Sequence, residues 1–167
     1  MLHRTLVATA VLALTGNCIY AQTPMQYNNK LVAITDSLHA KGSRWVQVFK
    51  EVKMIKEFSL LEPYRSDLQD YINDEITELK ADKDVSGSAE LKQAVLDFLA
   101  YEKSFVQQCF KPVEELDESS ADEELKAAID KISEEARKED ALLMKVNKAQ
   151  EAYARRNNFD IEAPNRK

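Results

Sequence analysis

The sequence predicts an all-α protein, an antiparallel up-and-down bundle of four helices in which the first and fourth helices are long. Apolar residues recur at alternating steps of three and four along most of the 167-residue chain, which is the period of one helix face. The chain holds only three Gly and four Pro, and no segment alternates β-branched with polar residues as a half-buried strand would. Amphipathic helices joined by short loops bury their apolar stripes best against one another.

The first helix is predicted to follow Pro24 and to continue for about four heptads. Gly42 and Ser43 interrupt its composition but not its phase, so we expect one long helix, bent at most at Gly42. The stripe skips one position, at Lys41. Its apolar residues are Tyr27, Leu31, Ile34, Leu38, Trp45, Val48, Val52 and Ile55.

The second helix is predicted to begin after a turn near residues 57–59. Ser59 and Glu62 have the spacing of a capping box there, and Pro63 suits the first turn of a helix. Residues 82–87 have the composition of a loop and should end this helix. Its face comprises Leu61, Tyr64, Leu68, Tyr71, Ile72, Ile76 and Leu79.

The third helix is predicted to start with Ser88 as its N-cap, and Pro112 should end or kink it because proline lacks a backbone donor. Its face is Leu91, Val95, Phe98, Phe105 and Cys109, so we expect Cys109 to be buried.

The fourth helix should open at Ser120, which has capping-box spacing to Glu123, and stop at Asn157-Asn158. Its apolar residues are Leu125, Ile129, Ile132, Ala136, Leu143, Val146 and Tyr153. A bundle domain is therefore expected over residues 22–158, followed by a flexible tail over residues 159–167.

Residues 1–21 have the pattern of a secretory signal peptide. His3 and Arg4 precede the apolar run 6–14, and Ala21 is the small residue that a signal peptidase requires. The apolar run is much shorter than the about 20 residues needed to span a bilayer. We therefore expect an exported chain beginning at Gln22, periplasmic, secreted or at the cell surface. Lipidation at Cys18 is the alternative, although Asn17 is a poor residue before a lipidated cysteine.

Composition excludes several functional classes. The formal net charge is −6, and the basic residues near the C-terminus lack an aromatic stacking platform, so nucleic-acid binding is not expected. Two Cys and two His exclude a disulfide framework and a zinc finger. Only His39 lies outside the predicted signal peptide, which excludes a di-iron bundle. No motif of a hydrolase, a P-loop protein or a dinucleotide-binding enzyme occurs. We expect neither an enzyme nor a cofactor.

Four segments carry a resemblance to known proteins. Residues 25–32, 36–42, 83–88 and 139–147 together resemble a family of small exported helical surface proteins from Bacteroidetes and spirochaetes whose function is unknown. The matching residues are mostly core and capping residues. The resemblance implies a cell-surface or periplasmic location, provides no catalytic residues, and includes many lipoproteins.

Three charged residues interrupt the apolar stripes. If the helices fold back symmetrically about their turns, Lys41, Glu75 and Glu139 fall in one mid-bundle layer. Glu102, also off the pattern, falls about 9 Å from this layer at 1.5 Å per residue. Such a layer would fix the register of the bundle or bind a cation or ligand. Alternatively, the three side chains lie at the edges of the stripes and reach water along their stems.

The loop between the second and third helices contains half of a calcium-binding pattern. Asp82, Asp84 and Ser86 stand at positions 1, 3 and 5, Gly87 at position 6 and Glu90 at position 9. Position 12, however, is glutamine instead of glutamate. The same residue types also form ordinary turns and caps.

A second polar feature is an acidic stretch. It holds seven acids between Glu114 and Glu124 and is expected to be a solvated loop that favours the start of the fourth helix, although it could also bind a cation or a partner.

Two functions of different kinds fit these observations. The first is an interaction or scaffold module that binds an envelope or surface partner, without a transmembrane span after the signal peptide. The second is a carrier of a small ligand or cation that uses either the 82–93 loop or an interhelical pocket. The aromatic residues available to line such a pocket are Trp45, Tyr71, Phe98 and Tyr153.

Overall fold

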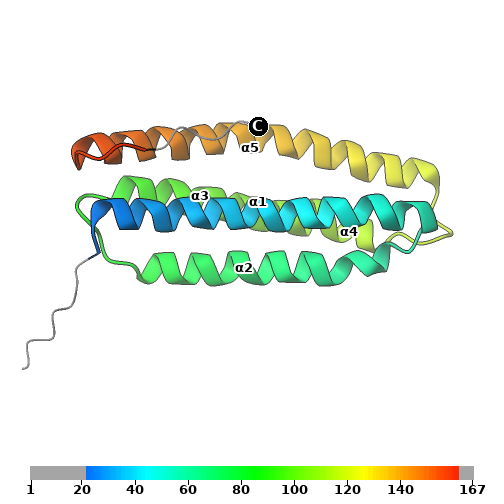
Figure 1. Ribbon diagram of the computed structural model, residues 1–167. Coiled ribbons are helices and arrows are strands. Elements are labelled where there is room, and N and C mark those ends of the chain that lie inside the picture. Colours follow the sequence, from blue (N-terminus) through cyan, green and yellow to red (C-terminus); the bar gives the residue numbers. More distant parts are fainter. Residues whose placement is uncertain (1–21, 162–167) are drawn as a thin grey trace, which may run out of the picture.

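The computed structural model describes residues 22–161, which form an antiparallel bundle of four helical rods. Figure 1 shows the rods running side by side along their full length. The first is α1 (Pro24–Ile55), and a 3₁₀ turn η1 (Phe58–Leu61) leads into α2 (Glu62–Ala81). The third rod is α3 (Ala89–Phe105), continued by a π-helical turn η2 (Val106–Phe110) and α4 (Lys111–Glu114). The last is α5 (Asp122–Arg156), so the predicted all-α bundle with long first and last helices is confirmed.

The predicted signal peptide, residues 1–21, and the last six residues of the predicted tail lie outside the described residues. The first three tail residues are described, and Phe159 does not extend away from the bundle. Its ring packs edge-on against Tyr153 with the centroids 5.8 Å apart, and its amide donates to the carbonyl of Ala154.

Helix α1 is a single continuous helix, as the unbroken apolar periodicity across Gly42 predicted. The helix continues through Gly42, and its stripe is buried from Tyr27 to Val52. Its N-terminus is closed by a reciprocal box that the sequence analysis did not identify: Thr23 Oγ1 accepts from the amide of Gln26, and Gln26 Oε1 accepts from the amide of Thr23. Lys56, in the left-handed region at φ 56°, ends the helix.

The three serine-based helix starts were predicted less well. Ser59 makes no capping bond, because burial of Phe58 and Leu61 already winds this segment into a 3₁₀ turn. Ser88 precedes α3 as predicted, but its hydroxyl bonds backward into the loop instead of capping the helix. Ser120 accepts from the amide of Asp117, so α5 begins two residues later, at Asp122.

Pro112 was predicted to end or kink the third helix, and the helix does end two residues later, at Glu114. The irregular part of the helix is the π-helical turn η2, which precedes the proline. In η2 the amide of Lys111 bonds to the carbonyl of Val106, five residues back, which widens the helix immediately before the proline ring. The widened turn keeps Val106, Cys109 and Phe110 buried.

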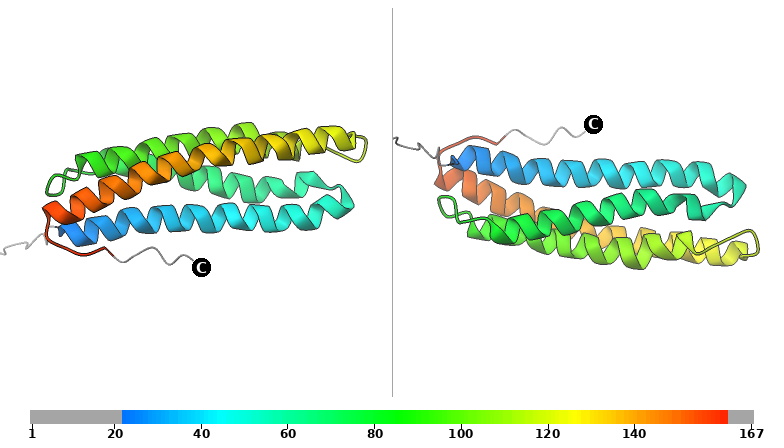
Figure 2. Two further views of the ribbon diagram at one scale, coloured as in Figure 1. Left: turned by 90° about the horizontal axis from the view of Figure 1, so that it is seen from above. Right: turned by 90° about the horizontal axis from the view of Figure 1, so that it is seen from below.

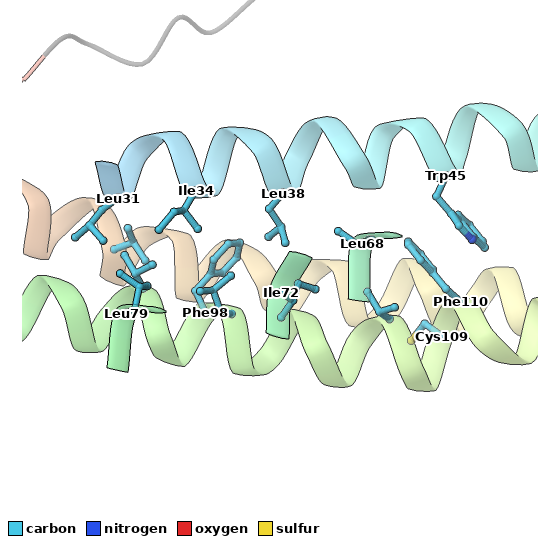
Figure 3. Close-up of a cluster of buried hydrophobic side chains, with 14 of the residues drawn as sticks. Leu31, Ile34, Leu38, Trp45, Leu68, Ile72, Leu79, Phe98, Cys109 and Phe110 are labelled. Atoms are coloured by element: carbon cyan, nitrogen blue, oxygen red, sulfur yellow. The ribbon is translucent and has the colours of Figure 1, made fainter. Parts of the chain in front are cut away.

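The core runs the whole length of the bundle and is filled by side chains from every rod. Figure 3 shows Leu31, Ile34 and Leu38 of α1 directed at the core residues of the other helices. In the C-terminal half of α1, Trp45 stacks parallel on Phe110 with ring centroids 3.8 Å apart, and on Phe49 at 5.5 Å. The largest fully buried side chains are Trp45, Tyr27, Tyr153, Phe98, Leu31 and Leu61.

Candidate functional site

The predicted layer of Lys41, Glu75 and Glu139 does not form as an ion cluster among residues 22–161. Lys41 Nζ donates to Asp67 Oδ2 at 2.6 Å and lies 5.4 Å from the centre of the Tyr71 ring. The lysine side chain is 30% exposed. This is the alternative in which the side chain lies at the stripe edge and reaches water along its stem.

The register of the first hairpin explains the different partner. Tyr71 Oη donates to the carbonyl of Ile34, and Lys41 reaches Asp67, so α2 lies about two helical turns from the position that a symmetric turn near residue 58 would give. Glu75 instead adjoins Tyr71 and the charges of Glu78 and Lys30. Burial, followed by Glu78, raises the pKa of Glu75, against the opposing effects of Tyr71 and Lys30.

Glu139 of α5 has a different carboxylate neighbour, Glu102 of α3. Burial, followed by Asp140, raises the pKa of Glu139, and His39 of α1 opposes that rise. Glu102 is 7% exposed, and its Oε1 atom has no hydrogen-bond partner. Burial first, and the charge of Glu139 second, raise the pKa of Glu102 to about 8. The structure thus brings Glu139 of the predicted layer near Glu102, which the sequence analysis had placed outside that layer.

The two aspartates of the predicted calcium loop bond to other groups of the protein. Asp82 accepts from Lys30 at 2.8 Å, and Asp84 accepts from the amide of Gly87 and the hydroxyl of Ser88. Ser86 and Gly87 adopt left-handed conformations at φ 52° and 80°. Glu90 lies 4.0 Å from Arg156. These bonds make the segment a structured turn that stops α2 and starts α3.

Within residues 22–161, no three His, Cys, Asp or Glu side chains come together in a way that could hold a metal ion. We therefore expect calorimetry with millimolar calcium to give no binding heat, because calcium would have to displace Lys30 from Asp82 and break the bonds of Asp84. Magnesium is the matched control titration. A saturable heat specific to calcium, abolished by Asp84→Asn, would contradict this expectation.

Of the four aromatic residues proposed to line a pocket, three lie in the packed core, and Tyr71 lines a surface groove between α1 and α2. Trp45, Phe98 and Tyr153 are 0–2% exposed and packed in the core. Tyr153 Oη donates to the carbonyl of Val85 at 2.8 Å, which fixes the end of α5 to the loop before α3. The two best-defined concave sites on the described residues are shallow surface grooves between α1 and α2.

One of these grooves lies at the turn between α1 and α2, and exposed apolar residues border it. Met54, Ile55 and Leu60 are 81%, 54% and 47% exposed, respectively. The groove is lined by Ile55 and Leu60 together with Val48, Glu51, Val52, Pro63 and Tyr64. We call these residues, with Met54 next to Ile55 in the chain, the turn-end patch. The other groove, which includes Lys30, Tyr71, Glu75 and Glu78, is lined by polar and charged groups as well as apolar ones.

The acidic stretch is not uniformly solvated. Glu114, its first residue, has a side chain that is only 8% exposed and accepts from Arg65 Nε of α2 at 2.8 and 2.9 Å. Its other acids are exposed, and Glu124 accepts from the amide of Ala121 at the start of α5. The predicted burial of Cys109 is confirmed at 2% exposure, and burial raises the pKa of its thiol.

None of the helices between residues 22 and 161 combines the length and apolar character needed to cross a bilayer. Comparison of the chain with models of protein families, with curated proteins and with solved structures gives no match.

Proposed function

We propose that this chain is an exported helical-bundle module that binds a protein partner of the cell envelope or cell surface through its turn-end patch. The observation that carries the proposal is the contrast between a filled interior and an apolar exterior site. Trp45, Phe98 and Tyr153 are packed in the core, whereas Ile55 and Leu60 line a surface groove. Met54, next to Ile55 in the chain, is also exposed. A contiguous patch of exposed apolar side chains on a folded protein commonly marks an interaction surface.

Export is supported by the sequence pattern of residues 1–21 and by the resemblance to exported surface proteins. The position of α1 also supports it, because the helix begins at Pro24, directly after the expected cleavage at Ala21. Cleavage there would leave the capping residue Thr23 and the whole bundle intact.

The expected N-terminus can be tested by intact-mass analysis of the exported protein. We expect a chain that begins at Gln22, because Ala21 satisfies the signal peptidase and Asn17 disfavours lipidation at Cys18. A chain that begins at Cys18 and carries a diacylglyceryl group would show that the lipoprotein pathway is used instead. Replacing Cys18 by Ser distinguishes the two routes. A chain that begins at Gln22 lacks residue 18 and should keep its mass, whereas the lipidated form should no longer be made.

The binding proposal is tested by affinity capture from an envelope extract of the source cell. The wild-type chain is compared with Ile55→Asp, which places a charge in the turn-end patch, and with Met144→Asp, an equally exposed position on α5 (57% against 54%). We expect one protein to be captured by the wild type and by Met144→Asp but lost with Ile55→Asp. Retention of that protein by Ile55→Asp would exclude this surface. A bound small molecule without a protein would favour the carrier function.

A further inference from the structure

Glu102, in the middle of the bundle, is 7% exposed, and its buried Oε1 atom has no hydrogen-bond partner. It occupies an inward position on α3, one turn from Phe98 and one turn from Val106, both of which are buried. Buried polar groups in folded proteins are nearly always hydrogen-bonded, and an unpaired buried charge is strongly unfavourable. The packing around Glu102 therefore suits its protonated, neutral form and opposes the carboxylate.

The groups that face Glu102 do not supply a compensating positive charge. From α5, Glu139 is the neighbour whose charge acts on Glu102, and Asp140 and His39 of α1 act in turn on Glu139. On α3, the hydroxyl of Tyr101 donates to Glu135. On α2 near mid-bundle, Asp67 pairs with Lys41 of α1, Glu75 adjoins Tyr71 of the same helix, and Asp70 and Asp74 are exposed. Figure 3 shows α2 contributing the apolar side chains Leu68 and Ile72 to the core.

Helix α5, which brings Glu139 to this place, is unevenly attached. Its C-terminal part carries all four of its fully buried residues and is bonded to the loop before α3 through Tyr153 and Asn157. Residues 122–145 contain no fully buried residue. Figure 2 shows α5 crossing the bundle obliquely, from the C-terminal end of the third rod to the N-terminal end of α1. Its N-terminal part therefore packs mainly on one neighbour.

We propose that residues 122–143 of α5 form a pH-sensitive arm, which packs on α3 while the Glu102 carboxyl holds its proton and separates from α3 when Glu102 ionises beside Glu139. The step is a simple ionisation. The Glu102 O–H bond breaks, the proton passes to water or hydroxide, and the resulting carboxylate is hydrated by water that enters as the arm moves away. The anchored C-terminal part of α5 remains in place, because burial raises the pKa of the Tyr153 hydroxyl, which therefore keeps its proton over this pH range and continues to donate to the carbonyl of Val85.

The direction of the pH dependence follows from the environment of Glu102. Burial and Glu139 raise its pKa from 4.5 to about 8 in the packed state. A carboxyl whose pKa is raised by packing stabilises the packed state fully below its ordinary value, and this contribution is lost as the pH rises toward the raised value. The arm is therefore held most tightly in acid, loosens progressively from about pH 5, and reaches its loosest state above about pH 8.

Amide hydrogen exchange of the full chain tests the proposal at pH 6, 7, 8 and 9. Each exchange rate is divided by that of Glu102→Gln at the same pH, so that the intrinsic pH dependence of exchange cancels. We expect the ratio over residues 122–143 to rise by up to about tenfold per pH unit and to level off above about pH 8. Glu134→Gln, which neutralises an exposed acid of the same helix, should behave like the wild type. A ratio that stays constant, or that rises equally in α1 and α2, would overturn the proposal.

A second variant keeps the test decisive if Glu102→Gln does not fold. Glu139→Gln removes the neighbouring charge while leaving the Glu102 carboxyl in place. Since Glu139 contributes to the raised pKa of Glu102, its removal should make the rise in exchange of residues 122–143 level off at a lower pH than in the wild type. An unchanged plateau position would show that the two acids do not act together on the arm.

Discussion

Replacing Trp45 by alanine is expected to lower the free energy of unfolding by about 3–5 kcal/mol, the range typical of a large aromatic side chain lost from a packed core. Trp45 is 1% exposed and stacks between Phe49 and Phe110. These rings join α1 to the π-helical turn η2, so the cavity would open where two rods meet. The surrounding rings would lose contact area that no neighbouring side chain is placed to restore.

Chemical denaturation at pH 7 measures this loss. Val46→Ala is the matched control, since Val46 is the next residue of α1 and is 40% exposed; it should cost less than about 1 kcal/mol. A loss below about 1 kcal/mol for Trp45→Ala would mean that the site collapses or that Trp45 is accessible. That result would revive the idea that the aromatic residues line a ligand pocket.

The second large effect is expected at the ion pair between Arg65 of α2 and Glu114 of α4. The side chains are 16% and 8% exposed, and Arg65 Nε lies 2.8 Å from Glu114 Oε2. Glu114→Ala leaves the partly buried guanidinium with only the exposed Glu62, 3.6 Å away, as a counter-charge. We therefore expect a loss of roughly 2–4 kcal/mol, somewhat below the range for a completely buried pair. Burial, opposed by Arg65, raises the pKa of Glu114, so protonation of this carboxyl in acid should not by itself lower the free energy of unfolding.

Two comparisons separate this pair from an ordinary surface pair. Asp67→Ala breaks the Lys41–Asp67 bond, where Asp67 is 64% exposed, and should cost less than about 1 kcal/mol. The double variant Arg65→Met with Glu114→Leu should recover much of the loss, because neither charge is then stranded. Equal costs for Glu114→Ala and Asp67→Ala, measured by urea denaturation, would show that solvent screens the Arg65–Glu114 pair.

The architecture could be predicted because helical periodicity is a local property. The stripe of α1 stayed in phase through Gly42, and burial of that stripe requires other helices of similar length. The exact helix starts were less predictable, because Ser59 and Ser120 have the right chemistry for caps but tertiary packing decided where each helix began. At Phe58 and Leu61 burial favoured a 3₁₀ turn over a capped start.

The polar interior could be predicted only in part. A symmetric hairpin was the simplest assumption for the register of Lys41 and Glu75, and η1 displaces that register. Glu139 was identified as an interruption of its stripe, but the buried acid on which its charge acts proved to be Glu102. Glu102 stands between Phe98 and Val106 at helical spacing, and this was the available signal that it lies inside. The burial of Glu114 could not be predicted, because in the sequence it belongs to a run of acids whose other members are exposed.

Four antiparallel rods return the chain to the end from which it started. Figure 1 shows the start of α1 and the end of α5 at one end of the bundle, with the turn between α1 and α2 at the other. Helix α1 has 32 residues, so about 48 Å separates its two ends at 1.5 Å per residue. Any tether attached ahead of α1 would make the molecule a spacer that displays the turn-end patch at its distal tip. A reporter joined directly before α1 or directly after α5 would be attached at the end opposite that tip and leave it unobstructed.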